Sequence, residues 1–225
     1  MTASREQTRT RIVEVAARLL REQGAAAVTV RAVAQEAGLQ APTIYRFFED
    51  KDALLDAVAE HVMAVYVADK AKTPALADPV EDLRAGWRTQ IDFGLANGAL
   101  YTLMSDLTRT RPSPAAEAGR EVLRARVHRI AAAGRLRVPE DRAVALIQAA
   151  GTGAVLTILS TPPELRDPTL ADDLLTAVLA VMLNDVAAVP SDTPTAVAVA
   201  FQAVAPTLPT LTPAERSLLS EWLSR

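Results

Sequence analysis

Polar side chains suited to binding nucleic acid lie in a short segment near the N-terminus. Residues 29–37 and 41–48 both show helical periodicity, and only a three-residue turn containing Gly38 separates them. Two short helices joined by such a turn form a helix-turn-helix, whose second helix can lie in the major groove of DNA. The apolar residues of the motif can form a small core. This spacing then leaves three polar side chains facing outward: Thr43, Tyr45 and Arg46.

The remaining sequence contains few residues that could form a catalytic site. The chain has no cysteine, and His61 and His128 are its two histidines. This excludes thiolate nucleophiles, cysteine-bound zinc, iron–sulfur clusters and a three-histidine metal site. Gly151 and Gly153 flank Thr152 inside an apolar helical pattern, without the strand or lysine that a phosphate-binding loop needs. We therefore expect no enzyme activity, no metal and no cofactor.

The composition favours helices throughout. Alanine contributes 44 of the 225 residues and aromatic residues only nine. Alanine is the best helix former, whereas strands prefer β-branched and aromatic side chains, so we expect an all-α protein. A chain of this length forms one or two domains and can bury a core without disulfides. Because no apolar run approaches 18 residues and the first 20 residues are rich in charge, we expect a soluble, cytoplasmic protein.

Periodicity and breaking residues predict where the helices begin and end. Ser4 with Gln7, and Thr212 with Glu215, match the capping-box pattern at the start of a helix. Residues 189–210 show only weak periodicity. The expected helices are residues 4–23, 29–37, 41–48, 51–70, 80–96, 98–108, 114–133, 139–160, 168–188 and 212–223.

The N-terminal segment resembles a known family. Residues 5–62 are similar to the DNA-binding domain of TetR-family transcriptional repressors, most clearly in the stretches 29–34, 38–48 and 51–55. The shared pattern has Thr and Arg opening the second helix and Gly in the turn. A small-residue recognition helix with Thr-x-Tyr follows and ends in aromatics, and a Lys begins the fourth helix. This combination is specific, whereas a bare helix-turn-helix match is weak.

The resemblance implies a role for each matching position. Positions that touch backbone phosphates in the family are occupied here by Thr29, Arg31, Tyr45 and Lys51. The recognition helix and the residue before it supply Gln40, Ala41, Pro42, Thr43 and Arg46. Arg46 is the candidate for paired hydrogen bonds to guanine, whereas Ala41 and Pro42 lack donors and suit thymine methyl groups. The alternative for Arg31 and Lys51 is an ordinary solvated side chain.

The charge distribution agrees with a DNA-binding N-terminus. The whole chain carries a formal net charge of −3 at pH 7. Residues 1–51 carry a net charge of +2 and residues 52–225 a net charge of −5. A positive segment on a mildly acidic body permits DNA binding but does not establish it.

The body resembles the regulatory domain of the same family at lower specificity. Residues 97–104 are similar to a Pro-x-Leu-Tyr-x-Leu-Met stretch of one subgroup, with Gly98 in place of the proline. Such domains bind a small effector inside a helical bundle, in a mostly apolar pocket. The candidate lining residues are Trp87, Ile91, Tyr101, Leu103, Met104, His128, Gln148 and Thr152. The alternative for most of them is ordinary packing in the core. For His128 the alternative is a place on a solvated helix face.

The segments 139–160 and 168–188 are apolar around most of their circumference, so they must be buried within the chain or against a second copy. We expect a homodimer in which these helices form a four-helix bundle, as the family resemblance implies. The alternative is a pair of internal helices. The candidate interface residues are Ala145, Ala149, Ala150, Gly153, Leu174, Val178, Val181 and Met182.

Together these features predict a regulator with three regions. We expect a DNA-binding domain in residues 1–50, a regulatory and dimerisation domain in 51–189 with residues 51–70 as connecting helix, and a Pro/Ala/Thr-rich segment in 190–225. The predicted function is repression from a palindromic operator, relieved by a small apolar effector. One alternative is a helical adaptor that binds protein instead of DNA. An all-α enzyme is the less favoured alternative, because the sequence lacks His and Cys chemistry.

Overall fold

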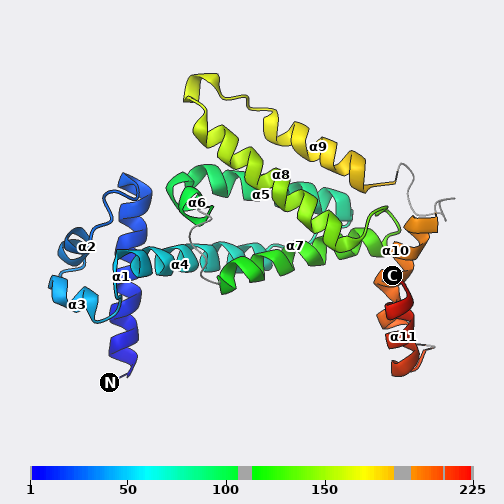
Figure 1. Ribbon diagram of the computed structural model, residues 1–225, viewed down its shortest axis with the longest axis horizontal. Coiled ribbons are helices and arrows are strands. Elements are labelled where there is room, and N and C mark those ends of the chain that lie inside the picture. Colours follow the sequence, from blue (N-terminus) through cyan, green and yellow to red (C-terminus); the bar gives the residue numbers. More distant parts are fainter. Residues whose placement is uncertain (1, 106–112, 185–193, 210, 224–225) are drawn as a thin grey trace. The chain divides into compact units, whose positions relative to one another are not determined.

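The fold is helical, as the composition predicts. The computed structural model describes residues 2–105, 113–184, 194–209 and 211–223. In these ranges every regular element is a helix (Figure 1). An isolated bridge pairs Leu136 with Leu183. The helices divide into two compact units, residues 1–73 with 96–119 (unit 1) and residues 74–95 with 120–225 (unit 2). The predicted functional boundaries at residues 50 and 189 stay predictions.

Unit 1 contains the N-terminal helices and one helix from further along the chain. Helix α1 contacts α2, α4 and α6, and α2 contacts α3. Their apolar faces meet in one core, in which Ile12, Ile44 and Leu54 are at most 1% exposed. The helices are α1 (Thr2–Gln23), α2 (Val30–Glu36), α3 (Ala41–Tyr45), α4 (Lys51–Lys72) and α6 (Gly98–Met104).

Unit 2 contains most of the remaining helices, and α8 packs along α9. Leu83, Ile130 and Leu136 are at most 1% exposed in its core. The helices are α5 (Pro79–Ala96), α7 (Pro114–Ala132), α8 (Glu140–Ser160), α9 (Leu170–Met182), α10 (Pro194–Val204) and α11 (Pro213–Leu223), with short 3₁₀ turns at Pro163–Leu165 and Ala205–Thr207. The ends of α5 and α7, at Ala96 and at 114–119, belong to unit 1.

A buried ion cluster holds α5 and α7 together in unit 2. The Asp82 side chain is only 4% exposed, and its Oδ2 accepts from Arg126 Nε at 3.2 Å and Arg129 Nη1 at 3.0 Å. Its Oδ1 accepts from the backbone N–H of Leu76 at 2.9 Å. The Arg126 guanidinium lies against Gly86, where an added Cβ would come within 2.8 Å of its Cζ. A buried carboxylate is tolerated because these donors replace its hydration.

Several helix boundaries differ from those predicted. Helix α1 begins at Thr2, so Ser4 lies inside the helix instead of capping it. Helix α6 ends at Met104, and the remainder of the predicted 98–108 helix lies largely outside the described residues. Helix α3 ends at Tyr45 instead of residue 48, because the backbone turns at Phe47 and Phe48, whose N–H groups both donate to Ile44 O.

Helix α9 ends at Met182 instead of residue 188, because a neighbouring loop captures its last carbonyls. Arg137 Nε donates to Val181 O at 2.8 Å, and the Arg137 backbone N–H donates to Met182 O at 2.9 Å. The chain then continues extended, and the Asn184 N–H donates to Arg135 O at 3.0 Å. These partners replace the next helical turn. The predicted residues 185–188 lie outside the described part.

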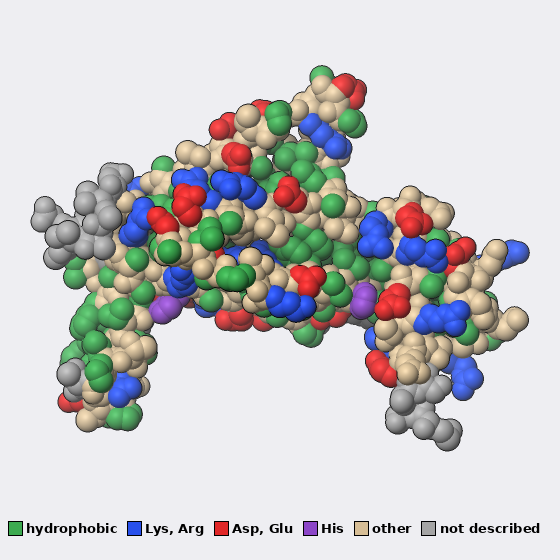
Figure 2. All heavy atoms as spheres, turned by 180° about the vertical axis from the view of Figure 1, so that it is seen from behind, with side chains coloured by type: hydrophobic (Ala, Val, Ile, Leu, Met, Phe, Trp, Pro, Cys, Tyr) green, Lys and Arg blue, Asp and Glu red, His purple; other side chains and the backbone are tan. Residues whose placement is uncertain are grey.

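The C-terminal segment has more structure than its weak periodicity predicts. Helix α10 was not predicted, although its run of Ala and Val after Pro194 suits a helix with proline in the first turn. The second capping box is confirmed, because Thr212 N and Oγ1 both donate to Glu215 Oε2 at 2.8 Å at the start of α11. Apolar side chains remain exposed on both helices, among them Phe201 and Trp222. Figure 2 shows hydrophobic side chains gathered over this part of the chain.

The described residues contain no group suited to a metal site and one helix that meets the criteria for a membrane span. No group of three or more His, Cys, Asp or Glu in these residues could hold a metal ion. Among the described helices, α8 alone is long and apolar enough to cross a membrane. A core helix of a soluble protein meets the same criterion, and α8 packs against α9 within unit 2.

Candidate nucleic-acid interface

The first helix of the motif begins at a capping threonine. Thr29 has an extended backbone, and its Oγ1 accepts from the Ala32 N–H at 3.1 Å. This bond satisfies one of the free N–H groups at the start of α2. Val33 and Ala34 are buried on one side of α2, whereas Arg31 is exposed on the other. The cap therefore fixes the start of the helix and leaves the guanidinium accessible to a ligand.

The turn between α2 and α3 depends on a glycine. Gly38 has φ of +63°, a left-handed conformation that other residues adopt at a cost. The Leu39 N–H donates to Ala34 O at 2.8 Å and closes the turn. Ala37 is fully buried beneath it. The small side chain allows the two helices to approach closely.

Helix α3 separates an apolar from a polar side within five residues. Ile44 is 1% exposed and anchors the helix in the core, whereas Tyr45 is 58% exposed. The remaining predicted DNA-binding residues of this segment divide by exposure: Gln40, Pro42 and Arg46 are exposed, and Ala41 and Thr43 are half-buried. All five are accessible in part, and they lie on one short helix and its flanks.

Lys51 stands at the first position of α4. Asp50 caps this helix, with its Oδ1 accepting from the Ala53 N–H at 2.6 Å. The Lys51 side chain is exposed at the N-terminal end of this helix, where the helix dipole favours anions. A separate ion pair between Arg18 of α1 and Glu36 of α2, at 3.1 Å, joins these two helices.

Two aromatic residues close the motif, and each lies beneath an arginine of α1. Phe48 is 5% exposed, and Phe47 is half-buried. The guanidinium carbons of Arg5 and Arg9 lie 5.8 and 5.4 Å from the ring centroids of Phe47 and Phe48. These two arginines are not among the residues predicted from the sequence. Their spacing of four residues, which places both on one face of a helix, is the signal that could have identified them.

The predicted ligand-lining residues are divided between the two units. Tyr101, Leu103 and Met104 belong to unit 1, and the other five to unit 2. Trp87, Ile91 and Tyr101 are buried; Leu103, Met104 and Gln148 are half-buried; Thr152 and His128 are exposed. In unit 2 the Trp87 ring lies 3.4 Å from a Cβ built on Gly151, and the buried Trp87 Nε1 has no hydrogen-bond acceptor in the described chain. The assignment of these residues to a ligand stays a prediction.

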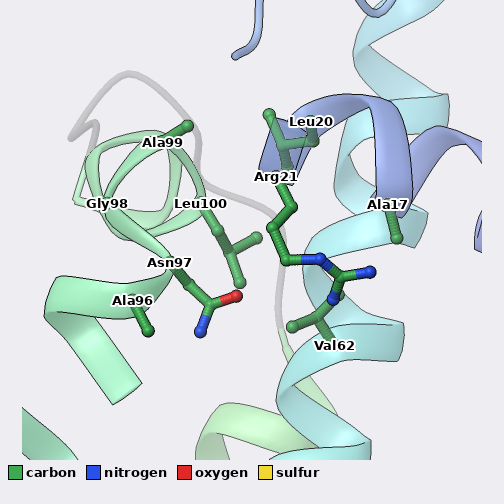
Figure 3. A pocket seen from close by; sticks show the side chains of 9 residues that line it. All are labelled: Ala17, Leu20, Arg21, Val62, Ala96, Asn97, Gly98, Ala99 and Leu100. Atoms are coloured by element: carbon green, nitrogen blue, oxygen red, sulfur yellow. The ribbon is translucent and has the colours of Figure 1, made fainter. Parts of the chain in front are cut away.

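A pocket in unit 1 is lined by none of the predicted ligand residues. It lies where α1, α4 and the start of α6 meet, with Arg21 and Asn97 as its polar side chains (Figure 3). Its volume is about 30 Å³, enough for one or two water molecules and too small for a typical effector.

The predicted dimer face is largely accessible, with one correction. On α8 the small residues Ala145, Ala149 and Gly153 are exposed and Ala150 is half-buried. On α9 Val181 is 51% exposed, and Leu174 and Val178 are half-buried. Met182 is fully buried inside unit 2, so its predicted interface role is wrong. It packs in the core because the loop carrying Arg137 folds over the end of α9.

Comparison with known families identifies the helix-turn-helix. The family model for bacterial regulatory proteins of the TetR family matches residues 12–58, which span most of α1, all of α2 and α3, and the start of α4. No curated protein matches the chain.

Solved structures share the fold over most of the chain. A TetR-family regulator from Pectobacterium atrosepticum has 19% identity and a TM-score of 0.62, covering 80% of this chain and 93% of its own. RolR in complex with resorcinol has 21% identity and a TM-score of 0.62, covering 89% and 96%. The ketosteroid regulator KstR2 of Mycobacterium tuberculosis has 19% identity and a TM-score of 0.52, covering 79% and 95%. At these identities the similarity shows the fold alone.

Proposed function

We propose that this chain, whose N-terminal domain matches the TetR family of transcriptional regulators over residues 12–58, binds a palindromic operator as a homodimer. In this proposal α3 lies in the major groove, and Arg46 reads a guanine by paired hydrogen bonds. Thr29, Arg31, Tyr45 and Lys51 hold the flanking phosphates and set the register without reading sequence. The two-fold symmetry of a dimer requires matching symmetry in the operator.

The observation that carries the proposal is the polar, exposed side of α3. Ile44 is buried, so α3 is held firmly in the core, while Tyr45 beside it is 58% exposed. Exposed aromatic rings add little to folding and are typical of binding surfaces. Arg46 and Lys51 lie within six residues of this ring, and both are exposed. A short helix that is anchored by a buried isoleucine and presents a phenol with nearby cations fits a duplex with charged phosphates around its groove.

The test is selection of random duplex DNA on the purified full chain at two salt concentrations. We expect one palindromic sequence with half-sites about 34–36 Å apart, or a multiple of that spacing. Weak binding without sequence preference that disappears in high salt would contradict the proposal.

A small effector controlling this binding is part of the proposal. The buried Trp87 Nε1, which lacks an acceptor, supports a ligand that brings one into the apolar core of unit 2. RolR, which shares the fold, binds resorcinol in its solved complex. An effector that separates the recognition helices lowers DNA affinity, and DNA then lowers effector affinity by the same factor. Once a ligand is identified, an unchanged ligand Kd at saturating DNA contradicts the coupling.

The proposal also assigns roles to the other regions. The exposed small residues of α8 and the apolar side of α9 support a dimer interface, because small side chains allow helices of two copies to approach closely. In this proposal residues 1–50 bind DNA. Residues 51–189 form the regulatory and dimerisation domain, and residues 190–225 form a further C-terminal segment. The protein acts in the cytoplasm, where bacterial operator DNA is located.

A helical adaptor that binds protein remains the second candidate, because the exposed side of α3 is also suited to a protein surface. Salt dependence separates the two candidates. Binding to DNA phosphates gives a steep linear fall of log affinity with log salt, with a slope of about −0.9 per phosphate bound. A protein partner gives a shallower dependence.

A further inference from the structure

Two arginines on the first turns of α1 lie beside the end of the recognition helix. Arg5 and Arg9 are four residues apart, so they project from the same face of α1. The Arg5 guanidinium lies over the ring of Phe47 at 5.8 Å from its centroid, and that of Arg9 over the ring of Phe48 at 5.4 Å. Both side chains are exposed. The pairs therefore hold two cations at fixed places on the surface.

These residues surround an open groove. Its volume is about 400 Å³, and its lining consists of Arg5, Glu6, Arg9 and Phe47. Two guanidinium groups and one carboxylate give this groove a formal charge of +1. Figure 2 shows Lys and Arg side chains over the part of the chain that carries α1–α3. The groove is thus concave, positive and open to a large anion.

The ring contacts leave the arginine donors available. A guanidinium that lies over an aromatic ring interacts with it through its charge, so its N–H groups can still pair with a phosphate. Within the described residues neither Arg5 nor Arg9 has a carboxylate within ion-pair distance, in contrast to Arg18, which pairs with Glu36. The ring contact also reduces the side-chain entropy that binding must otherwise remove.

The groove is fixed relative to α3. The N–H groups of Phe47 and Phe48 donate to Ile44 O at 2.9 and 3.0 Å, so both rings follow directly from the recognition helix. Lys51 begins α4 three residues later. An anion in the groove therefore lies beside the same stretch of chain that presents Arg46 and Lys51.

We propose that Arg5 and Arg9 bind a backbone phosphate of the DNA that α3 reads, so that the DNA-binding surface extends onto α1. This inference rests on the proposed function, because it assumes that α3 binds duplex DNA. Phe47 and Phe48 are positioning residues in it: they orient the guanidinium groups and do not touch the DNA. The two arginines add affinity for every sequence and leave sequence preference unchanged.

The test measures DNA affinity of the full chain by fluorescence anisotropy over a series of salt concentrations. The probes are the duplex recovered by selection and a duplex of scrambled sequence. Each substitution, Arg5→Ala or Arg9→Ala, should weaken binding to both duplexes alike. The slope of log affinity against log salt should fall by about 0.9 for each phosphate that the variant no longer binds, hence by about 1.8 in a dimer. Arg9→Lys should retain most of the slope.

The matched control is Arg21→Ala, which removes the same charge from the other end of α1. At 1.5 Å per residue Arg21 lies about 24 Å from Arg5 along the helix, so its removal should leave the slope unchanged. Phe47→Leu keeps both charges but releases Arg5, and it should weaken binding less than Arg5→Ala. Thermal unfolding of each variant distinguishes weaker phosphate binding from a destabilised fold.

The outcomes separate this inference from the proposed function. If the wild-type chain selects an operator and the slopes of Arg5→Ala and Arg9→Ala equal the wild-type slope, this inference is wrong and the proposed function stands. Equal decreases of slope in Arg21→Ala would also overturn it, because they would indicate only a general effect of charge. If the wild-type chain binds no duplex, both fail. Binding of inorganic phosphate by the wild type but not the variants, without any change in DNA slopes, would show a site for free anions only.

Discussion

Arg46 and Lys51 each carry one positive charge at the edge of the helix-turn-helix, but their chemistry predicts different effects. Arg46→Ala should relax the choice of base at one position of each half-site, costing about 1–3 kcal/mol for the preferred base. Lys51→Ala should weaken binding to all DNA sequences alike. It should also reduce the slope of log affinity against log salt by about 0.9 per phosphate released. Repeating the duplex selection and the salt titration with each variant measures both effects. Identical behaviour of the two variants would contradict the assigned roles.

Gly86 is required by a side chain 40 residues away in the sequence. A Cβ at this position would press on the Arg126 guanidinium, which is held by Asp82 and cannot move freely. Gly86→Ala should therefore destabilise the fold by about 1–3 kcal/mol, although alanine is the better helix former. Denaturant unfolding measures the free energy of unfolding.

The control for Gly86 is a double-mutant cycle. In an Arg126→Met background the space above Gly86 is relieved, and Gly86→Ala should become neutral or stabilising by up to about 1 kcal/mol. The same destabilisation in both backgrounds would show that the guanidinium is not the cause.

At the scale of elements, α4 and the start of α7 are joined within unit 1 by one carboxylate. Glu60 Oε2 accepts from Ser113 Oγ and Oε1 accepts from the Ala115 N–H, both at 2.8 Å. Glu60→Ala leaves the N–H of the buried Ala115 without this partner and should cost about 1–3 kcal/mol. Faster hydrogen exchange at Ala115 and Ala116 is the expected readout. Glu60→Gln, which keeps one acceptor, should be destabilised less, and equal exchange in both variants would contradict the assignment.

The capping box of α11 predicts a pH dependence. Hydrogen bonds from the Thr212 backbone N–H and hydroxyl lower the pKa of Glu215 below its usual value near 4.5. A lowered pKa means that the ionised carboxylate stabilises this end of the helix above pH 4.5, and the contribution is lost as pH falls through the folded-state pKa. Thr212→Ala should move the pKa of Glu215 back toward 4.5 in an NMR titration. A pKa that does not change would show that the hydroxyl contributes nothing.

At the scale of the whole molecule, the predicted homodimer can be tested on α9. Val181 is 51% exposed on the predicted face, and Thr176 is exposed roughly opposite it on the same helix. Val181→Glu would bury an unpaired charge in the interface, costing about 2 kcal/mol or more, so the dimer Kd should rise at least about 30-fold. Thr176→Glu adds the same charge on the other side of the helix and should leave the dimer Kd unchanged. Sedimentation equilibrium measures the dimer Kd of both variants, and equal effects would contradict the proposed face.

Local signals along the chain account for the helical fold and the helix-turn-helix. Composition predicts the helices, and the start of α2 and the turn depend on neighbours in the chain: Thr29 caps the third residue after it, and Gly38 permits a turn closed by bonds to residues three and five positions away. Such signals are readable without tertiary structure. The division of α3 into a buried and an exposed side followed from the same spacing.

Features that depend on residues far apart in the sequence became known only from the folded chain. Met182 is a core residue and α9 ends there because Arg137, 45 residues earlier, captures the last carbonyls. The pairing of Asp82 with Arg126, 44 residues away, and of Arg5 with Phe47 likewise has no local signal. Periodicity reports which face of a helix is apolar, but not which distant side chain will lie against it. For that reason the arginines of α1 were recognised as part of a candidate DNA-binding surface only in the tertiary structure.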